Sequence, residues 1–124
     1  MEVGKRNIAT FEDLEVWQQS QQLAVDVYTI SKAFPKEELF GITNQVRRAS
    51  VSVSANIAEG FGRATVKDKL QFLSIAYGSL LETKSFVYLS KRLEYINDED
   101  ADKLLAQAVT CQKLLNGFRR SLQS

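Results

Sequence analysis

The chain has 124 residues, of which 44% are hydrophobic and 25% are charged, the composition of one globular domain of ordinary size. Its net charge of +1 gives no global reason to bind nucleic acid or a membrane surface, and the absence of histidine excludes imidazole catalysis and histidine-ligated metals. The lone Cys111 excludes an internal disulfide, and neither a secretory h-region nor an apolar run of ~18 residues is present, so we expect a cytoplasmic protein without membrane contact.

Residues 1–9 are predicted to be a flexible arm, and residues 10–124 a single domain. Thr10 with Asp13 resembles a capping box, so a first helix is expected from about Phe11 to Ala33. Phe34-Pro35 ends this helix, because the residue before proline is disfavoured in the helical region. The connection over 36–41 has room for one short helical turn.

The stretch QVRRASVSVSANIAEGFGR, residues 45–63, is predicted to be a long central helix against which the other segments pack, closed by Phe61-Gly62. At about 100° per residue its positions divide into three faces. An apolar seam is formed by Ile42, Val46, Ala49, Val53, Ile57 and Gly60. A polar face carries Gln45, Arg48, Ser52, Asn56, Glu59 and Arg63. The third face carries the small residues Ser50, Val51, Ser54, Ala55 and Ala58. We expect another helix, from the bundle or from a second subunit, to approach this face closely; the alternative is that these residues only fill space at the surface.

A third helix is expected from a cap at Thr65 to about Tyr95, and it is apolar on two sides. One side contains Leu70, Leu73, Tyr77, Leu80, Leu81 and Tyr88. The other contains Phe72, Ile75, Ala76, Ser79, Phe86 and Leu93. A fourth helix follows a cap at Asn97 or Asp98, and its unbroken seam consists of Ala101, Leu104, Ala108, Cys111, Leu115, Phe118 and Leu122.

Four long helices joined by short connections predict an all-α fold, an antiparallel up-down-up-down four-helix bundle. The first and third helices are apolar over more surface than one bundle buries, so we expect a homo-oligomer, as a closed ring or a dimer. Phe72 and Phe86 are the candidate oligomer residues on the third helix.

No catalytic constellation is present, and no cofactor or metal site is predicted. Glu59 and Glu82 are the two carboxylates with a candidate internal position, and as a pair they could act in acid–base chemistry. The structural alternative, which we favour, is that each is hydrogen-bonded or ion-paired within the bundle, Glu59 with Arg63 at i,i+4. We therefore expect a protein that is not an enzyme.

The charge is unevenly distributed along the chain. Residues 41–69 contain five basic residues against two acids, an excess of three positive charges. These candidate phosphate-binding residues are Arg47, Arg48, Arg63, Lys67 and Lys69. The alternative is that Arg47 and Arg48 pair with carboxylates across helices while the lysines solvate a turn.

The segments FEDLEVWQQSQQLAVDVY, FPKEELFGITNQVRRASVSVSANIAEGFGR and FLSIAYGSLLET resemble a bacterial family of four-helix-bundle proteins encoded in intervening sequences of 23S rRNA genes. The resemblance runs from Phe11 to about Leu122 and implies a pentameric ring. The chain is also similar, more distantly, to the accessory variability protein of diversity-generating retroelements, which implies nucleic acid and a reverse transcriptase as partners. That protein is strongly basic, whereas this chain is nearly neutral. The family elements QxRRA and AEGxxR match Gln45, Arg47, Arg48, Ala49, Ala58, Glu59, Gly60 and Arg63.

The sequence is compatible with two functions. The first is a homo-oligomeric adaptor that binds the backbone of RNA or DNA through the five basic residues. The second is a protein-interaction scaffold without nucleic-acid affinity, favoured by the near-zero charge and the wide apolar faces.

Overall fold

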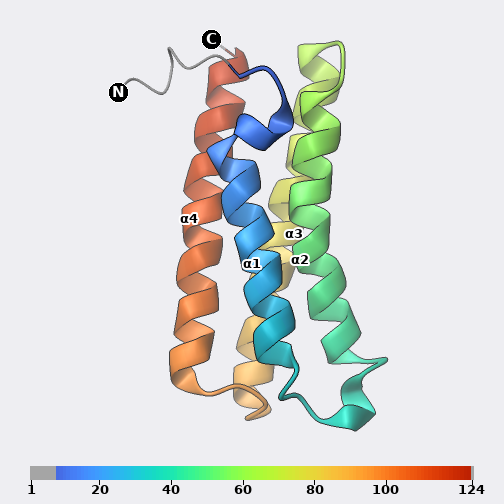
Figure 1. Ribbon diagram of the computed structural model, residues 1–124, viewed down its shortest axis with the longest axis vertical. Coiled ribbons are helices and arrows are strands. Elements are labelled where there is room, and N and C mark those ends of the chain that lie inside the picture. Colours follow the sequence, from blue (N-terminus) through green and yellow to red (C-terminus); the bar gives the residue numbers. More distant parts are fainter. Residues whose placement is uncertain (1–7, 124) are drawn as a thin grey trace.

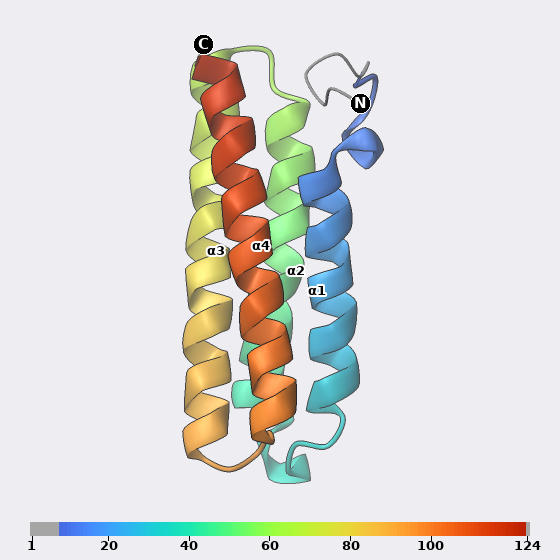
Figure 2. The ribbon, with the colours of Figure 1, turned by 90° about the vertical axis from the view of Figure 1, so that its left-hand side faces the viewer.

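The computed structural model describes residues 8–123, whose regular structure is entirely helical. Four long helices lie side by side, and successive helices are connected at alternate ends of the molecule (Figures 1 and 2). Most of the predicted flexible arm, residues 1–7, lies outside the described residues. The elements are the 3-10 helix η2 (Phe11–Asp13), α1 (Glu15–Ser31), the 3-10 helix η3 (Lys36–Glu38), α2 (Ile42–Phe61), α3 (Val66–Arg92) and α4 (Asp98–Gln123).

The first helix begins later than its sequence predicts. The Asp13 carboxylate accepts a hydrogen bond from the Thr10 amide at 3.4 Å, as in a capping box, but this motif closes only the 3-10 turn η2. Leu14 follows with an extended backbone, at ψ 124°, and separates η2 from α1. Leu14 is buried in the core. Because of this break, the helix that was expected over Phe11 to Ala33 begins only at Glu15.

The other helix ends are set by specific caps. The Thr65 hydroxyl accepts from the Asp68 amide at 3.1 Å, and the Asn97 side chain accepts from the Asp100 amide at 2.7 Å, so Asn97 is the cap of α4. Gly62 follows α2 as predicted, but its φ of −82° is right-handed. Glu94 instead adopts a left-handed φ of 63° and ends α3 three residues before the predicted boundary at Tyr95.

The core is built from one seam of each helix. All six positions of the apolar seam predicted for α2 are buried, as are Ala101, Leu104, Ala108, Cys111 and Leu115 of α4. Helix α2 packs against α1 and α3, whereas α4 lies across the bundle and packs against α1 and α3 instead. The expectation that every segment packs on the central helix is therefore wrong for α4.

Gly60 allows α2 and α3 to approach closely near their connection. A Cβ atom at this position would lie 3.1 Å from both the Lys69 carbonyl oxygen and the Phe72 Cβ. Because both atoms belong to or adjoin the α3 backbone, they cannot move aside as a flexible side chain would. The close approach brings the polar face of α2 alongside α3.

Candidate functional site

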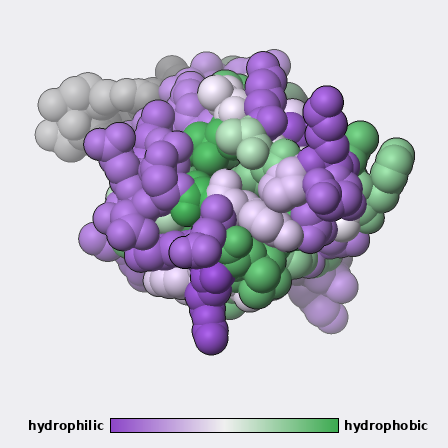
Figure 3. All heavy atoms as spheres, turned by 90° about the horizontal axis from the view of Figure 1, so that it is seen from below, coloured by the Kyte–Doolittle hydropathy of each residue, from purple (hydrophilic) through white to green (hydrophobic). Residues whose placement is uncertain are grey.

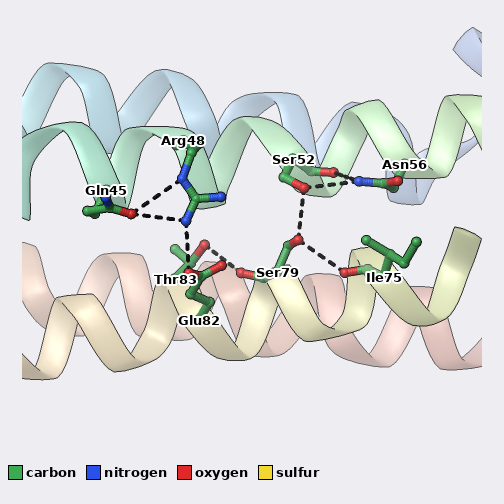
Figure 4. A network of polar contacts seen from close by, with 8 residues as sticks. All are labelled: Gln45, Arg48, Ser52, Asn56, Ile75, Ser79, Glu82 and Thr83. Atoms are coloured by element: carbon green, nitrogen blue, oxygen red, sulfur yellow. Dashed lines mark hydrogen bonds and ion pairs between the residues drawn. The ribbon is translucent and has the colours of Figure 1, made fainter.

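An ion pair between α2 and α3 joins Arg48 to Glu82. The Arg48 guanidinium donates to the Glu82 carboxylate at 3.0 Å and to the Gln45 side-chain oxygen at 3.0 and 3.3 Å (Figure 4). The arginine side chain is 55% exposed and the glutamate side chain 41%. Arg48 is thus held along the α2–α3 groove, as the alternative interpretation of the basic residues predicts.

Small polar side chains continue this contact along the groove. The hydroxyl oxygens of Ser52 and Ser79 are 2.9 Å apart, and Asn56 donates to the Ser52 hydroxyl at 3.0 Å (Figure 4). Thr83 donates to the Ser79 carbonyl one turn further, at 2.8 Å. These bonds satisfy the polar groups of a tight helix–helix contact.

The two candidate carboxylates are not brought together. Glu59 accepts from Arg63 at 2.8 Å, as its i,i+4 spacing predicts, while Glu82 is bound to Arg48. Arg48 and Glu59 are separated by about 16 Å along the axis of α2. Each glutamate therefore has its own arginine, and the arrangement does not form an acid–base pair.

The five candidate basic residues lie in three separate places. Arg47 faces α1, where its Nε donates to the Ser31 hydroxyl at 2.8 Å and its guanidinium lies 4.8 Å from the centre of the Tyr28 ring. Arg48, about 100° further round the same helix, faces α3. The other three lie around the α2–α3 connection: Arg63, Lys67 and Lys69.

The group around the α2–α3 connection is only partly available for binding. The Arg63 guanidinium lies 4.4 Å from the centre of the Phe72 ring and is paired with Glu59. The Lys69 amine donates to the Phe61 carbonyl at 2.6 Å. Lys67 is exposed and contributes to none of these contacts. The sequence excess of three positive charges therefore does not become one continuous basic patch.

The surface of the described chain also carries exposed apolar side chains. Twelve large hydrophobic side chains are exposed among residues 8–123, and half of them lie on α3 or directly after it: Val66, Ile75, Leu81, Tyr88, Leu89 and the C-cap residue Leu93. Ile75, Leu89 and Leu93 share a line of three- and four-residue spacing with Gly78, Glu82 and the half-buried Phe86. We call these six residues the outer seam of α3.

The two phenylalanines that the sequence favoured as oligomer residues are half-buried in their own subunit. Phe72 lies beneath Arg63, and Phe86 packs against the core. Substituting either one would weaken the subunit itself as well as any contact between subunits. Ile75, Leu89 and Leu93, which are exposed by 48%, 45% and 45%, are therefore better probes of a surface contact.

The sequence did not single out Phe40, the most exposed large hydrophobic residue in the described chain. Its side chain is 92% exposed, and that of the preceding Leu39 is 49% exposed. Both were assigned only to the connection between the first two helices. The available signal was the pair of large apolar residues within a short turn, where polar residues are usual.

Other potential sites are less developed. An apolar groove of about 510 Å³ lies between the start of α1 and the end of α4, with Leu14, Phe61 and Phe118 in its wall.

Burial raises the pKa of the Cys111 thiol, with the Ser20 hydroxyl opposing the shift, so this cysteine is an inert part of the core. Within residues 8–123 no three metal-ligating side chains cluster, and no helix is long and apolar enough to span a bilayer.

Comparisons with known proteins agree on one family. The model of the 23S rRNA-intervening sequence proteins matches residues 12–117. A solved structure from Bacteroides thetaiotaomicron VPI-5482, a protein with unknown function from the S23 ribosomal protein family, is similar with a TM-score of 0.78 and 27% identity, over 84% of this chain and 97% of that one. No curated protein matches in sequence. The chain therefore belongs to the family of 23S rRNA-intervening sequence proteins.

Proposed function

We propose that this protein is a non-enzymatic binding scaffold that works as a closed homo-oligomer of up-down-up-down bundles, joined through the outer seam of α3. The observation that carries the proposal is the exposure of this seam. Ile75, Leu89 and Leu93 are each about half exposed, and burying the exposed half contributes about 1 kcal/mol each. A second copy would bury them together.

Gly78 supports close packing on this seam. It lies in the middle of α3, where glycine costs about 1 kcal/mol relative to alanine, and apart from the adjoining backbone of α3 itself no atom of the described chain lies within 4 Å of a Cβ placed there. Nothing inside the subunit therefore requires a glycine at this position. An approaching helix from another copy supplies the reason, because glycine lets two backbones come close.

The exposed part of the small face of α2 is the proposed partner surface. Val51 is 43% exposed and Ala55 is also exposed, while Ser50 and Ser54 of the same face are buried. Ser52 lies level with Ser79 in the bundle, and the two helices are antiparallel, so Val51 and Gly78 differ in height by only about 3 Å. A parallel copy at the same height would place this small face of α2 against the outer seam of α3.

Substitution of exposed seam residues tests this function. The variants Ile75→Glu and Leu89→Glu should leave the helical circular-dichroism spectrum unchanged but convert the oligomer to monomer in light scattering coupled to size exclusion. Val109→Glu is the matched control, because Val109 is an exposed apolar residue of α4 outside the seam. An oligomer that survives both seam substitutions would overturn the proposal. Five subunits in a ring are what the family resemblance implies.

Nucleic-acid binding is the second candidate function, and the exposed basic residues at the α2–α3 connection favour it. Arg63 and Lys67 are both exposed there, and an oligomer would repeat them on every subunit, so that weak phosphate contacts add up. Binding to a labelled structured RNA should then weaken steeply with salt and with Arg63→Ala and Lys67→Ala together. A reverse transcriptase as protein partner rests on the resemblance alone and stays a prediction.

A further inference from the structure

Leu39 and Phe40 form an apolar projection at the end of the bundle where α1 connects to α2. Figure 3 views this end, where hydrophilic side chains form most of the rim and hydrophobic atoms project at one edge. Leaving a Phe ring 92% exposed forgoes roughly 1.5–3 kcal/mol of burial. The isolated subunit therefore gains nothing from this projection, which points to a contact outside it.

The turn that carries the projection is firmly held. The Glu38 carboxylate accepts from the Tyr95 hydroxyl at 2.8 Å and from the Ile42 amide at 3.4 Å. The Tyr95 ring packs on Phe34, with ring centres 5.8 Å apart. Glu38 thus ties the turn both to the start of α2 and to the α3–α4 connection. Because the turn is already ordered, little conformational entropy remains to be lost when Phe40 is bound.

We propose that Leu39 and Phe40 insert against the last turns of α3 in a second copy of this chain, around Leu89 and Leu93. This inference rests on the proposed function and specifies how the copies are placed. The two leucines are each 45% exposed, and the adjacent Arg92 is exposed, as is Glu37 beside the projection. Apolar groups would thus face apolar groups, and an acidic side chain would face a basic one.

The heights of these groups within the bundle agree with this placement. Arg48 lies level with Glu82, and α2 and α3 run in opposite directions (Figure 1). Moving from Arg48 toward the start of α2 therefore leads to the same end of the bundle as moving from Glu82 toward the end of α3. Phe40 precedes Arg48 by eight residues, and its height along the bundle axis is that of the last turns of α3. Two parallel copies at the same height therefore have Phe40 of one copy at the height of Leu89 and Leu93 of the other. Phe40 cannot already occupy these leucines in its own subunit, because its side chain is almost fully exposed.

Cross-linking between differently tagged copies tests the proposal. A Phe40→Cys chain with a size tag is co-expressed with an untagged Leu93→Cys chain, and the mixture is treated with a short bismaleimide. We expect a mixed dimer of distinct mass on a denaturing gel. Val66→Cys replaces Leu93→Cys in the control, because Val66 is an exposed residue at the opposite end of α3. The natural Cys111 is 1% exposed and should not react.

A second variant separates this inference from the proposed function. Phe40→Ser should raise the dissociation constant of the oligomer at least tenfold, without changing the helical content of the subunit. A stable wild-type oligomer that shows neither the cross-link nor an effect of Phe40→Ser would overturn the inference and leave the scaffold proposal standing. A wild-type protein that is monomeric throughout would overturn both.

Discussion

The Arg48 guanidinium of α2 lies 3.0 Å from the Glu82 carboxylate of α3, so this arginine is ion-paired within its own subunit. Both side chains are about half exposed. An ion pair of this kind contributes only ~0–1 kcal/mol, because water screens the charges and two long side chains must be ordered. The main consequence of the pair is therefore that Arg48 is less available to bind a ligand; its contribution to the stability of the fold is small.

Glu82→Gln should therefore release Arg48 at little structural cost. We expect the free energy of unfolding to change by less than about 1 kcal/mol. If Arg48 contacts phosphate, its release should strengthen RNA binding at low salt, measured by fluorescence anisotropy. Glu59→Gln, which releases Arg63 in the same way, is the matched comparison. Equal RNA affinity in the wild type and both variants would exclude these arginines as phosphate ligands.

Gly60→Ala should introduce about 1–3 kcal/mol of packing strain, because the added methyl group would lie 3.1 Å from the Lys69 carbonyl oxygen and the Phe72 Cβ. Alanine's better helix propensity should offset about 1 kcal/mol of this strain. Gly62→Ala is the matched control. Its Cβ would find only carbonyl oxygens at 3.7 and 3.9 Å, and its φ of −82° suits any residue. Denaturant unfolding of the three proteins measures the difference. Equal losses at both glycines would argue against the close α2–α3 contact.

Gly78→Ala should have opposite effects on the subunit and on its assembly. Alanine favours the helix by about 1 kcal/mol at an exposed position, so the unfolding midpoint of the dilute subunit should rise. The same methyl group would obstruct the proposed approach of a second copy, so the oligomer should dissociate at higher protein concentration than the wild type. A more stable subunit with unaltered assembly would mean that nothing packs closely on Gly78.

The buried thiol of Cys111 should weaken the fold at alkaline pH. Burial raises the pKa of this thiol above its ordinary value, so the unfolded chain releases the proton at a lower pH than the folded chain does. Above about pH 8.5 the unfolded state binds fewer protons, and stability falls as pH rises. Cys111→Ala should lose less stability than the wild type between pH 7 and pH 10 in urea unfolding. Equal losses in the two proteins would contradict this account of Cys111.

Most of the fold follows from hydrophobic periodicity. The seam of α2 from Ile42 to Gly60 is buried at all six predicted positions, because a three- and four-residue spacing leaves only one way for a helix to face a core. The sequence signals for helix N-termini were less reliable than this periodicity. Thr10 and Asp13 have the chemistry of a helix cap, yet that chemistry satisfies a single turn equally well, and the turn ends at Leu14.

The candidate basic site was predicted less well, and the reason lies in helix geometry. Arg47 and Arg48 are adjacent in sequence but about 100° apart around the axis, so one contacts α1 and the other contacts α3. A sum of charges along the chain cannot reveal this separation. Phe40 was missed for a different reason: periodicity identifies helix faces, whereas the exposure of a turn residue depends on how the whole chain folds around it.

The mass of the unmodified protein in solution tests the central claim most directly. Sedimentation equilibrium over a range of protein concentrations gives this mass without a variant or a ligand. Association through the outer seam of α3 predicts a species whose mass is a defined multiple of the 14.0 kDa chain, persisting at micromolar concentration and insensitive to salt. A single 14.0 kDa species at every concentration would contradict the scaffold proposal and the interpretation of the exposed apolar surface.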